Sequence, residues 1–83
     1  MNLNSDLFER LKALLCQELD AQPEAVKLES LLIEDLAADS LDLVNLALQV
    51  EDDFQIEVSE RDLLQLKTVG DVLQYVSARV QAV

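Results

Sequence analysis

Residues 39–54 read D-S-L-D-L-V-N-L-A-L-Q-V-E-D-D-F, and this stretch decides the fold. Asp39 and Asp42 form an acidic variant of the capping box, which places carboxylates where first-turn N–H groups and the helix dipole favour negative charge. The apolar residues that follow recur at three- and four-residue steps. This period predicts a helix that begins at about Ser40 and ends at about Phe54.

The predicted helix is apolar on two sides when its residues are spaced at about 100°. The ordinary core face consists of Leu43, Leu46, Ala47, Val50 and Phe54. A second apolar stripe of Leu41, Val44 and Leu48 lies roughly opposite, with Glu51 and Asp52 flanking its far end. Two interpretations stay open: either the preceding loop covers this stripe, or the stripe docks a partner.

The N-terminal segment has the same helical period, in Leu7, Phe8, Leu11, Leu14, Leu15 and Leu19. We expect a helix over about residues 5–20, capped by Ser5 or Asp6, with Pro23 just past its end. Residues 21–39 lack a sustained period and are expected to form a long loop, which in so small a domain is usually functional. Its apolar anchors are expected to be Val26, Leu28, Leu31, Leu32, Ile33 and Leu36.

Two more helices are expected after Val58. Ser59 with Asp62 caps a short third helix, and Thr68 with Asp71 caps the last one. The third helix is expected to carry Leu63, Leu64 and Leu66, and the last presents Val69, Val72, Leu73, Val76 and Val80 on one face. Without a convincing strand, the predicted fold is all-α: a small four-helix bundle with a short third helix and a long loop between the first two. One domain is expected over residues 1–83.

Composition narrows the functional classes. Six Lys and Arg against seventeen Asp and Glu give a net charge of −11, which repels nucleic acid and anionic lipid headgroups. We therefore expect no nucleic-acid partner and, without a sufficiently long apolar window, no membrane insertion. The lone Cys16 and the absence of a signal-like N-terminus favour the cytoplasm.

The residues for catalysis or metal binding are missing. The chain has no histidine to activate Ser40 or Cys16, and Cys16 is expected to be a surface thiol without a role. Residues 35–46 are acidic, but Ser40 and Leu46 stand where an EF-hand requires glycine and glutamate. We therefore expect neither an enzyme nor a metal site.

The segment D-L-A-A-D-S-L-D at residues 35–42 resembles the acyl carrier protein signature D-[LF]-G-x-D-S-L-[DE], whose serine receives 4′-phosphopantetheine. The family spacing continues through residues 51–54 (E-D-D-F), 56–58 (I-E-V) and 68–69 (T-V), and through Tyr75. The resemblance therefore covers essentially the whole chain.

The resemblance implies roles for individual residues. Ser40 would be the attachment residue, with Asp39 and Leu41 as the neighbours presented to a phosphopantetheinyl transferase. Partner enzymes would recognise Leu41, Val44, Leu48, Glu51 and Asp52. A short acyl chain would shelter among Leu46, Val50, Phe54, Val58, Leu66 and Tyr75.

The implied function is a monomeric carrier of acyl thioesters in fatty acid synthesis or in a dedicated lipid or polyketide pathway. Its partners would be acyltransferases, ketosynthases, reductases and dehydratases. Ala37, Asn45 and Ser59 replace a glycine, a glutamate and a proline that are common in the family, which leaves room for a dedicated pathway. The alternatives are a peptidyl or aminoacyl carrier, and a non-carrier acidic helical adaptor in which Ser40 is only a cap.

Overall fold

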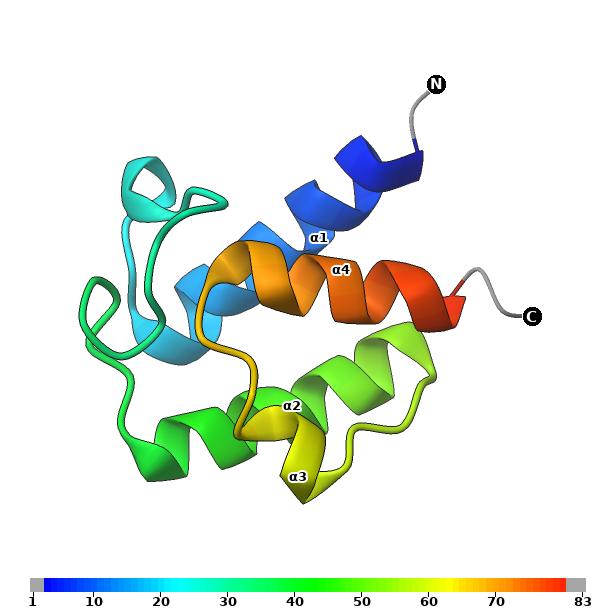
Figure 1. The fold of residues 1–83 in the computed structure, drawn as a ribbon. Helices are drawn as coiled ribbons and strands as arrows, with labels where there is room; N and C mark the ends of the chain where they lie inside the picture. The colour runs from blue at the N-terminus through cyan, green and yellow to red at the C-terminus, as the bar shows by residue number, and fades with distance from the viewer. Residues whose placement is uncertain (1–2, 81–83) are drawn as a thin grey trace.

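The computed structural model describes residues 3–80, with side chains from residue 6 onward, and this range contains four α-helices. They are α1 (Leu3–Leu19), α2 (Ser40–Phe54), α3 (Glu60–Leu63) and α4 (Val69–Val80). In Figure 1, α1, α2 and α4 form the body of the bundle, and the short α3 lies beside α2. The expected all-α bundle is confirmed; the nearest approach to a strand in residues 3–80 is an isolated bridge between Leu31 and Thr68.

The core is aliphatic apart from Phe54, and it draws on all three long helices and the first loop. The side chains most completely removed from water are Leu11, Leu15, Leu32, Leu46, Val69 and Val76. α3 contributes no fully buried residue. The free energy from burying apolar area therefore holds α1, α2 and α4 together and acts only weakly on α3.

Arg10 of α1 closes the end of α2. Its guanidinium lies 4.5 Å from the centre of the Phe54 ring, and it donates a hydrogen bond of 2.8 Å to the Asp53 carbonyl. A cation at this end complements the helix dipole and satisfies one of the last carbonyl groups.

The first loop differs from the sequence prediction. It contains a 3-10 helix, η1 (Pro23–Ala25), and only Val26, Leu32 and Leu36 among the expected anchors are buried. Leu28 and Ile33 are 49% and 59% exposed, so their assignment as anchors is wrong. The backbone holds the loop at Leu28 instead, because the Leu28 carbonyl accepts a 2.8 Å hydrogen bond from the Gly70 N–H.

Several local expectations also need correction. α1 begins at Leu3, so Ser5 and Asp6 lie within its first turn and do not precede it as caps. α3 ends at Leu63, and Leu64 is its C-cap, with an N–H that still bonds the Glu60 carbonyl. The Gln65 and Leu66 N–H groups close tighter i→i−3 turns, so Leu64 and Leu66 lie outside the helix.

Cys16 is half-buried and packs against the core, so it is not the surface thiol that the helical wheel predicted. The wheel underestimates the buried side of α1 because α2, α4 and η1 all pack against this helix. None of the helices in residues 3–80 is both long and apolar enough to cross a bilayer.

Candidate functional site

Ser40 is the first residue of α2, and its side chain is exposed. The predicted capping box is present: Asp39 Oδ1 accepts a 2.8 Å hydrogen bond from the Asp42 N–H, and Asp42 Oδ2 accepts one of 3.2 Å from the Asp39 N–H. Because Asp39 caps the helix, Ser40 is not needed for that role. Its hydroxyl makes no hydrogen bond within the described part of the chain.

Hydrogen bonds within the first loop tie down the residues before Ser40. Asp35 Oδ2 accepts a 2.8 Å hydrogen bond from the Leu31 N–H, and the Ala38 N–H donates one of 3.0 Å to the Leu32 carbonyl. Ala38 is buried, whereas Ala37 has a φ of 59°. Ala37 therefore occupies the left-handed region that glycine adopts without strain. This turn directs the chain out of the core and into α2.

The second apolar stripe of α2 is exposed. Leu41, Val44 and Leu48 are 68%, 49% and 56% exposed, so the interpretation that the loop covers them is wrong. Leu64, which is 74% exposed, shares with Val44 and Leu48 a groove of about 430 Å³ that also includes Ser40. Leu64 was predicted to lie within the third helix, whereas it is the C-cap of α3 and faces this groove.

The two acids at the end of the stripe differ. The Asp52 side chain is exposed, and within residues 3–80 it makes no hydrogen bond. Glu51 is half-buried, and its Oε2 accepts a 2.8 Å hydrogen bond from the Val58 N–H. Glu51 therefore also fastens the linker between α2 and α3 to α2.

Most of the residues expected around an acyl chain converge on one interior cavity, which has a volume of about 10 Å³. They are Leu46, Val50, Val58, Leu66 and Tyr75. Phe54 is not among the lining residues, because its ring is buried beneath Arg10 at the other end of α2. The cavity is close to the smallest that holds one water molecule, so the interior is closed.

A polar cluster joins α3 to α4 beside this cavity. The Tyr75 hydroxyl donates a 2.7 Å hydrogen bond to Asp62 Oδ2, and Arg79 Nη2 lies 3.3 Å from the same oxygen. The Arg79 guanidinium also stacks 3.5 Å from the centre of the Tyr75 ring. The Tyr75 hydrogen bond lowers the pKa of Asp62, while burial, followed by that same bond, raises the pKa of Tyr75.

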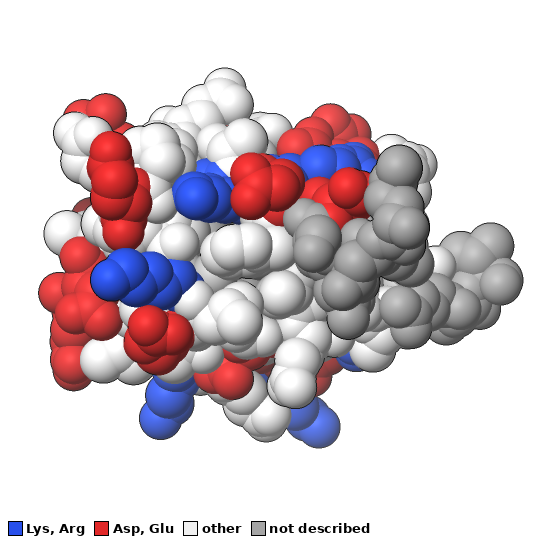
Figure 2. All heavy atoms as spheres, turned by 90° about the horizontal axis from the view of Figure 1, so that it is seen from above, with Lys and Arg blue, Asp and Glu red and all other residues white. Residues whose placement is uncertain are grey.

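Acidic side chains dominate the surface charge. On the face seen in Figure 2, Lys and Arg are separated from one another, and Asp and Glu gather towards the rim. In residues 3–80, no group of three or more His, Cys, Asp or Glu side chains converges as a metal site.

One family of known proteins matches this chain. The phosphopantetheine attachment site family matches residues 9–76. An acyl carrier protein from Chlamydia trachomatis serovar D is 48% identical over 73 residues, which are 88% of this chain and 95% of the relative. An acyl carrier protein from Thermosynechococcus vestitus is 40% identical over 78 residues, which are 94% of this chain and 96% of the relative. A Mycobacterium tuberculosis structure, solved as a candidate acyl carrier protein, superimposes with a TM-score of 0.81 at 35% identity, covering 87% of this chain and 96% of that one.

Proposed function

Because the chain belongs to the acyl carrier proteins, which are carriers and not enzymes, we propose that Ser40 bears the covalent 4′-phosphopantetheine of this family. The supporting observation is the exposed Ser40 hydroxyl, which is free of hydrogen bonds within residues 3–80 because Asp39 serves as the cap. A phosphodiester on Ser40 would carry its negative charge at the N-terminus of α2, where the helix dipole favours it. The residues present therefore fit the group.

The bound arm supplies a thiol that holds the acyl group as a thioester. The protein's own contribution is to present the arm: the turn at Ala37 and the Asp39 cap fix where α2 starts, and Leu41 extends beside the attachment residue. Tethering to Ser40 raises the effective concentration of the acyl group at any enzyme that docks nearby.

The exposed stripe of α2 is the proposed docking surface for the phosphopantetheinyl transferase and for the enzymes that process the acyl group. Those enzymes would be acyltransferases, ketosynthases, reductases and dehydratases. Leu41, Val44 and Leu48 would form the centre, and Glu51 and Asp52 would form the rim. Rim charges speed encounter with a basic partner, whereas a small apolar centre keeps the complex transient.

Leu46, Val50, Val58, Leu66 and Tyr75 are the proposed shelter for a short acyl chain. Their cavity must widen before any chain fits, since its volume is only about 10 Å³. Phe54 would support the base of α2 without touching the chain.

The departures from the family pattern bear on the pathway. Ala37 and Ser59 have structural roles in the loop turn and in the cap of α3, whereas Asn45 is exposed on α2. Asn45 is therefore the departure that would alter partner choice, consistent with a dedicated lipid or polyketide pathway beside general fatty acid synthesis. We place the carrier, as one domain over residues 1–83, in the cytoplasm.

Intact-mass measurement after incubation with a broad-specificity phosphopantetheinyl transferase and coenzyme A tests the attachment. The parent protein should gain the mass of one phosphopantetheine group, and Ser40→Ala should gain none. Ser59→Ala, which removes a hydroxyl at another helix start, is the matched control and should be modified like the parent. Modification of Ser40→Ala would refute the assignment, and failure to modify the parent would favour the adaptor alternative.

A further inference from the structure

The start of α2 is tied to the protein from the side of the first loop. The first fully buried residue of α2 is Leu46, whereas Ser40 and Leu41 are exposed and Leu43 is only partly buried. The last buried residue before Ser40 is Ala38. Because helix ends fray where they lack tertiary contacts, the position of Ser40 depends on how firmly the chain is fixed at Ala38.

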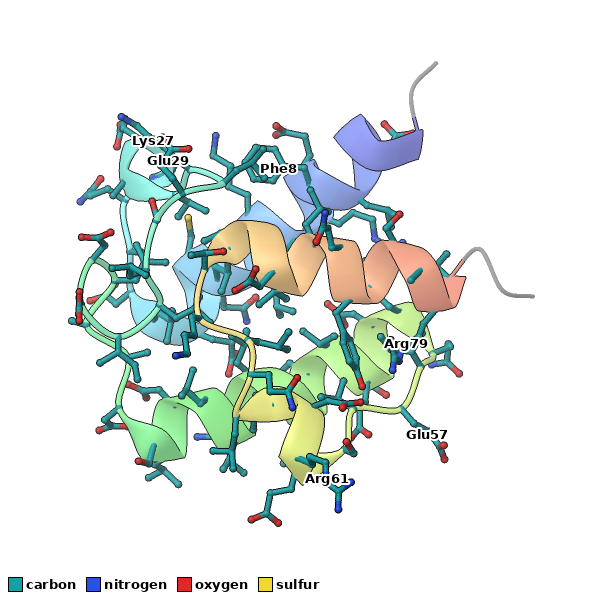
Figure 3. The ribbon with its side chains drawn as sticks, viewed as in Figure 1. Phe8, Lys27, Glu29, Glu57, Arg61 and Arg79 are labelled. Atoms are coloured by element: carbon teal, nitrogen blue, oxygen red, sulfur yellow. The ribbon has the colours of Figure 1, made fainter. Side chains whose placement is uncertain are left out.

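Ala38 is fixed through Leu32. The Ala38 N–H donates a 3.0 Å hydrogen bond to the Leu32 carbonyl, and the Leu32 N–H donates one of 2.9 Å to the Lys67 carbonyl in the linker that leads to α4. The Leu32 side chain is itself part of the core. Figure 3 shows Lys27 and Glu29 beside η1, at the end of the first loop that lies away from α2. The support for α2 therefore comes from the other end of this loop.

One side chain closes this end of the loop. Asp35 Oδ2 accepts a 2.8 Å hydrogen bond from the Leu31 N–H, and the Asp35 N–H donates one of 2.9 Å to the Leu31 carbonyl. Asp35 thereby engages both backbone groups of Leu31 and holds the turn of residues 31–38, with a carboxylate that makes a stronger bond than a neutral acceptor. The side chain of the adjacent Glu34 makes no hydrogen bond within residues 3–80. The two acids carry the same charge, but only one holds the turn.

We propose that Asp35 is a positioning residue for the modification of Ser40, acting through the turn of residues 31–38. The inference rests on the proposed attachment at Ser40. In that reaction Ser40 Oγ forms a bond to the phosphorus that carries pantetheine, and the pyrophosphate P–O bond of coenzyme A breaks. The adenosine bisphosphate part leaves with the bonding electron pair, and the Oγ proton passes to a base of the transferase. A misplacement of about 1 Å can slow such a step about a hundredfold, so the support of α2 bears directly on the rate.

Single-turnover transfer from coenzyme A, with the carrier in excess over the transferase, separates positioning from loss of fold or of docking. The carrier is the substrate, so partial unfolding or weaker docking raises the carrier concentration that gives half of the maximal rate. Misplacement of the Ser40 hydroxyl instead lowers the maximal rate constant. Asp35→Ala should lower that constant by about tenfold or more and change the half-saturating concentration by less than about twofold.

Two controls separate the hydrogen bond from the charge. Asp35→Asn keeps an oxygen that accepts from the Leu31 N–H, and its maximal rate constant should stay within about threefold of the parent value. Glu34→Ala removes the same charge one residue away and should behave like the parent. If Asp35→Asn is as slow as Asp35→Ala, or if Glu34→Ala is slowed equally, the charge and not the turn is responsible, and the proposal is overturned.

Hydrogen–deuterium exchange of the unmodified protein tests the turn without any transferase. Asp35→Ala should speed exchange at the Leu31 and Ala38 amides by about tenfold and leave the Val50 amide in the middle of α2 unchanged. Unchanged exchange at Leu31 and Ala38 would show that the carboxylate does not hold the turn. If Val50 also loses protection, Asp35→Ser decides the matter, because its shorter hydroxyl weakens the bond without abolishing it and should lower the maximal rate constant by about threefold.

The outcomes for the turn and for the attachment are distinct. A parent protein that is modified, together with an Asp35→Ala variant that reaches the parental maximal rate constant, would overturn the positioning role and leave the attachment at Ser40 intact. A parent protein that is not modified would remove both.

Discussion

Glu51 accepts a 2.8 Å hydrogen bond from the Val58 N–H, so an acid at the end of the exposed stripe of α2 also holds the linker that leads to α3. Asp52, the next residue, is exposed and has no hydrogen bond from its side chain within residues 3–80. From the sequence, Glu51 and Asp52 were predicted to act together as charges at the rim of the stripe. The structure gives them different physical roles, and substitutions separate those roles.

Glu51→Lys should lower the free energy of unfolding by about 1–2 kcal/mol, because it leaves the half-buried Val58 N–H without its acceptor. Asp52→Lys should change it by less than about 0.5 kcal/mol, and in the favourable direction, since a cation suits the last turn of a helix. Urea denaturation of both variants measures the difference. Equal destabilisation by the two substitutions would contradict the role of Glu51 in holding the linker.

Docking should respond differently to charge and to apolar contact. Asp52→Lys should slow association with the phosphopantetheinyl transferase and flatten its dependence on salt, because rim charges mainly set the encounter rate. Leu48→Ala, which truncates an exposed residue in the centre of the stripe, should instead speed dissociation at every ionic strength. Stopped-flow binding resolves the two rates. If both folded variants bind like the parent, α2 is not the docking surface.

Ala37→Gly should raise the free energy of unfolding by up to about 1 kcal/mol, because relief of the left-handed conformation outweighs the added entropy of the unfolded chain. Ala38→Gly is the matched control. Ala38 is buried and is not in the left-handed region, so losing its methyl group should destabilise the protein. Thermal and urea denaturation measure the stability of both variants. Destabilisation by Ala37→Gly as large as that by Ala38→Gly would contradict strain at residue 37.

The Asp71 carboxylate predicts a pH dependence. The backbone N–H groups of Lys67 and Thr68 donate hydrogen bonds to it and lower its pKa in the folded protein. A lowered folded-state pKa gives stability that is complete above the unfolded value of about 4 and is lost as the pH falls through the folded value. Asp71→Asn should therefore be less stable than the parent at pH 7, and the gap should narrow below about pH 4. Denaturation curves from pH 7 to pH 2.5 measure this difference in the free energy of unfolding. A difference that stays constant over that range would contradict the role of the Asp71 carboxylate.

The parts of the fold that the sequence predicts best are those encoded within a few neighbouring residues. Asp39 with Asp42 and Thr68 with Asp71 each lie within four residues, and both capping pairs form as expected. The exposure of Leu28 could not be predicted, because its carbonyl is held by Gly70, which lies far along the chain. Leu28 was predicted to be an anchor only because its side chain is apolar.

The same limit applies to the site. Ser40 and its stripe could be located from local spacing and from the family resemblance, since both lie on one helix. The boundary between the groove and the cavity could not be predicted. Both are lined by Ala47, Val58 and Leu63, which come from three separate segments of the chain. The hydrogen bond between Glu51 and Val58 was missed for a similar reason, because a linker has no periodicity that shows where it folds back.

The pairing of the first loop with the start of α4 determines which parts of the chain unfold together. The N–H groups of Leu32, Val69 and Gly70 donate across this junction to Lys67, Ser30 and Leu28, at 2.9, 3.0 and 2.8 Å. A Cβ atom at Gly70 would lie 3.0 Å from the Leu28 carbonyl oxygen, so a side chain at this position would push the two backbones apart. These three amides should therefore exchange with deuterium as slowly as those in the middle of α4, whereas the α3 amides exchange sooner. The loop between α1 and α2 is thus expected to belong to the most slowly opening unit of the protein, and the helix α3 to the most quickly opening one.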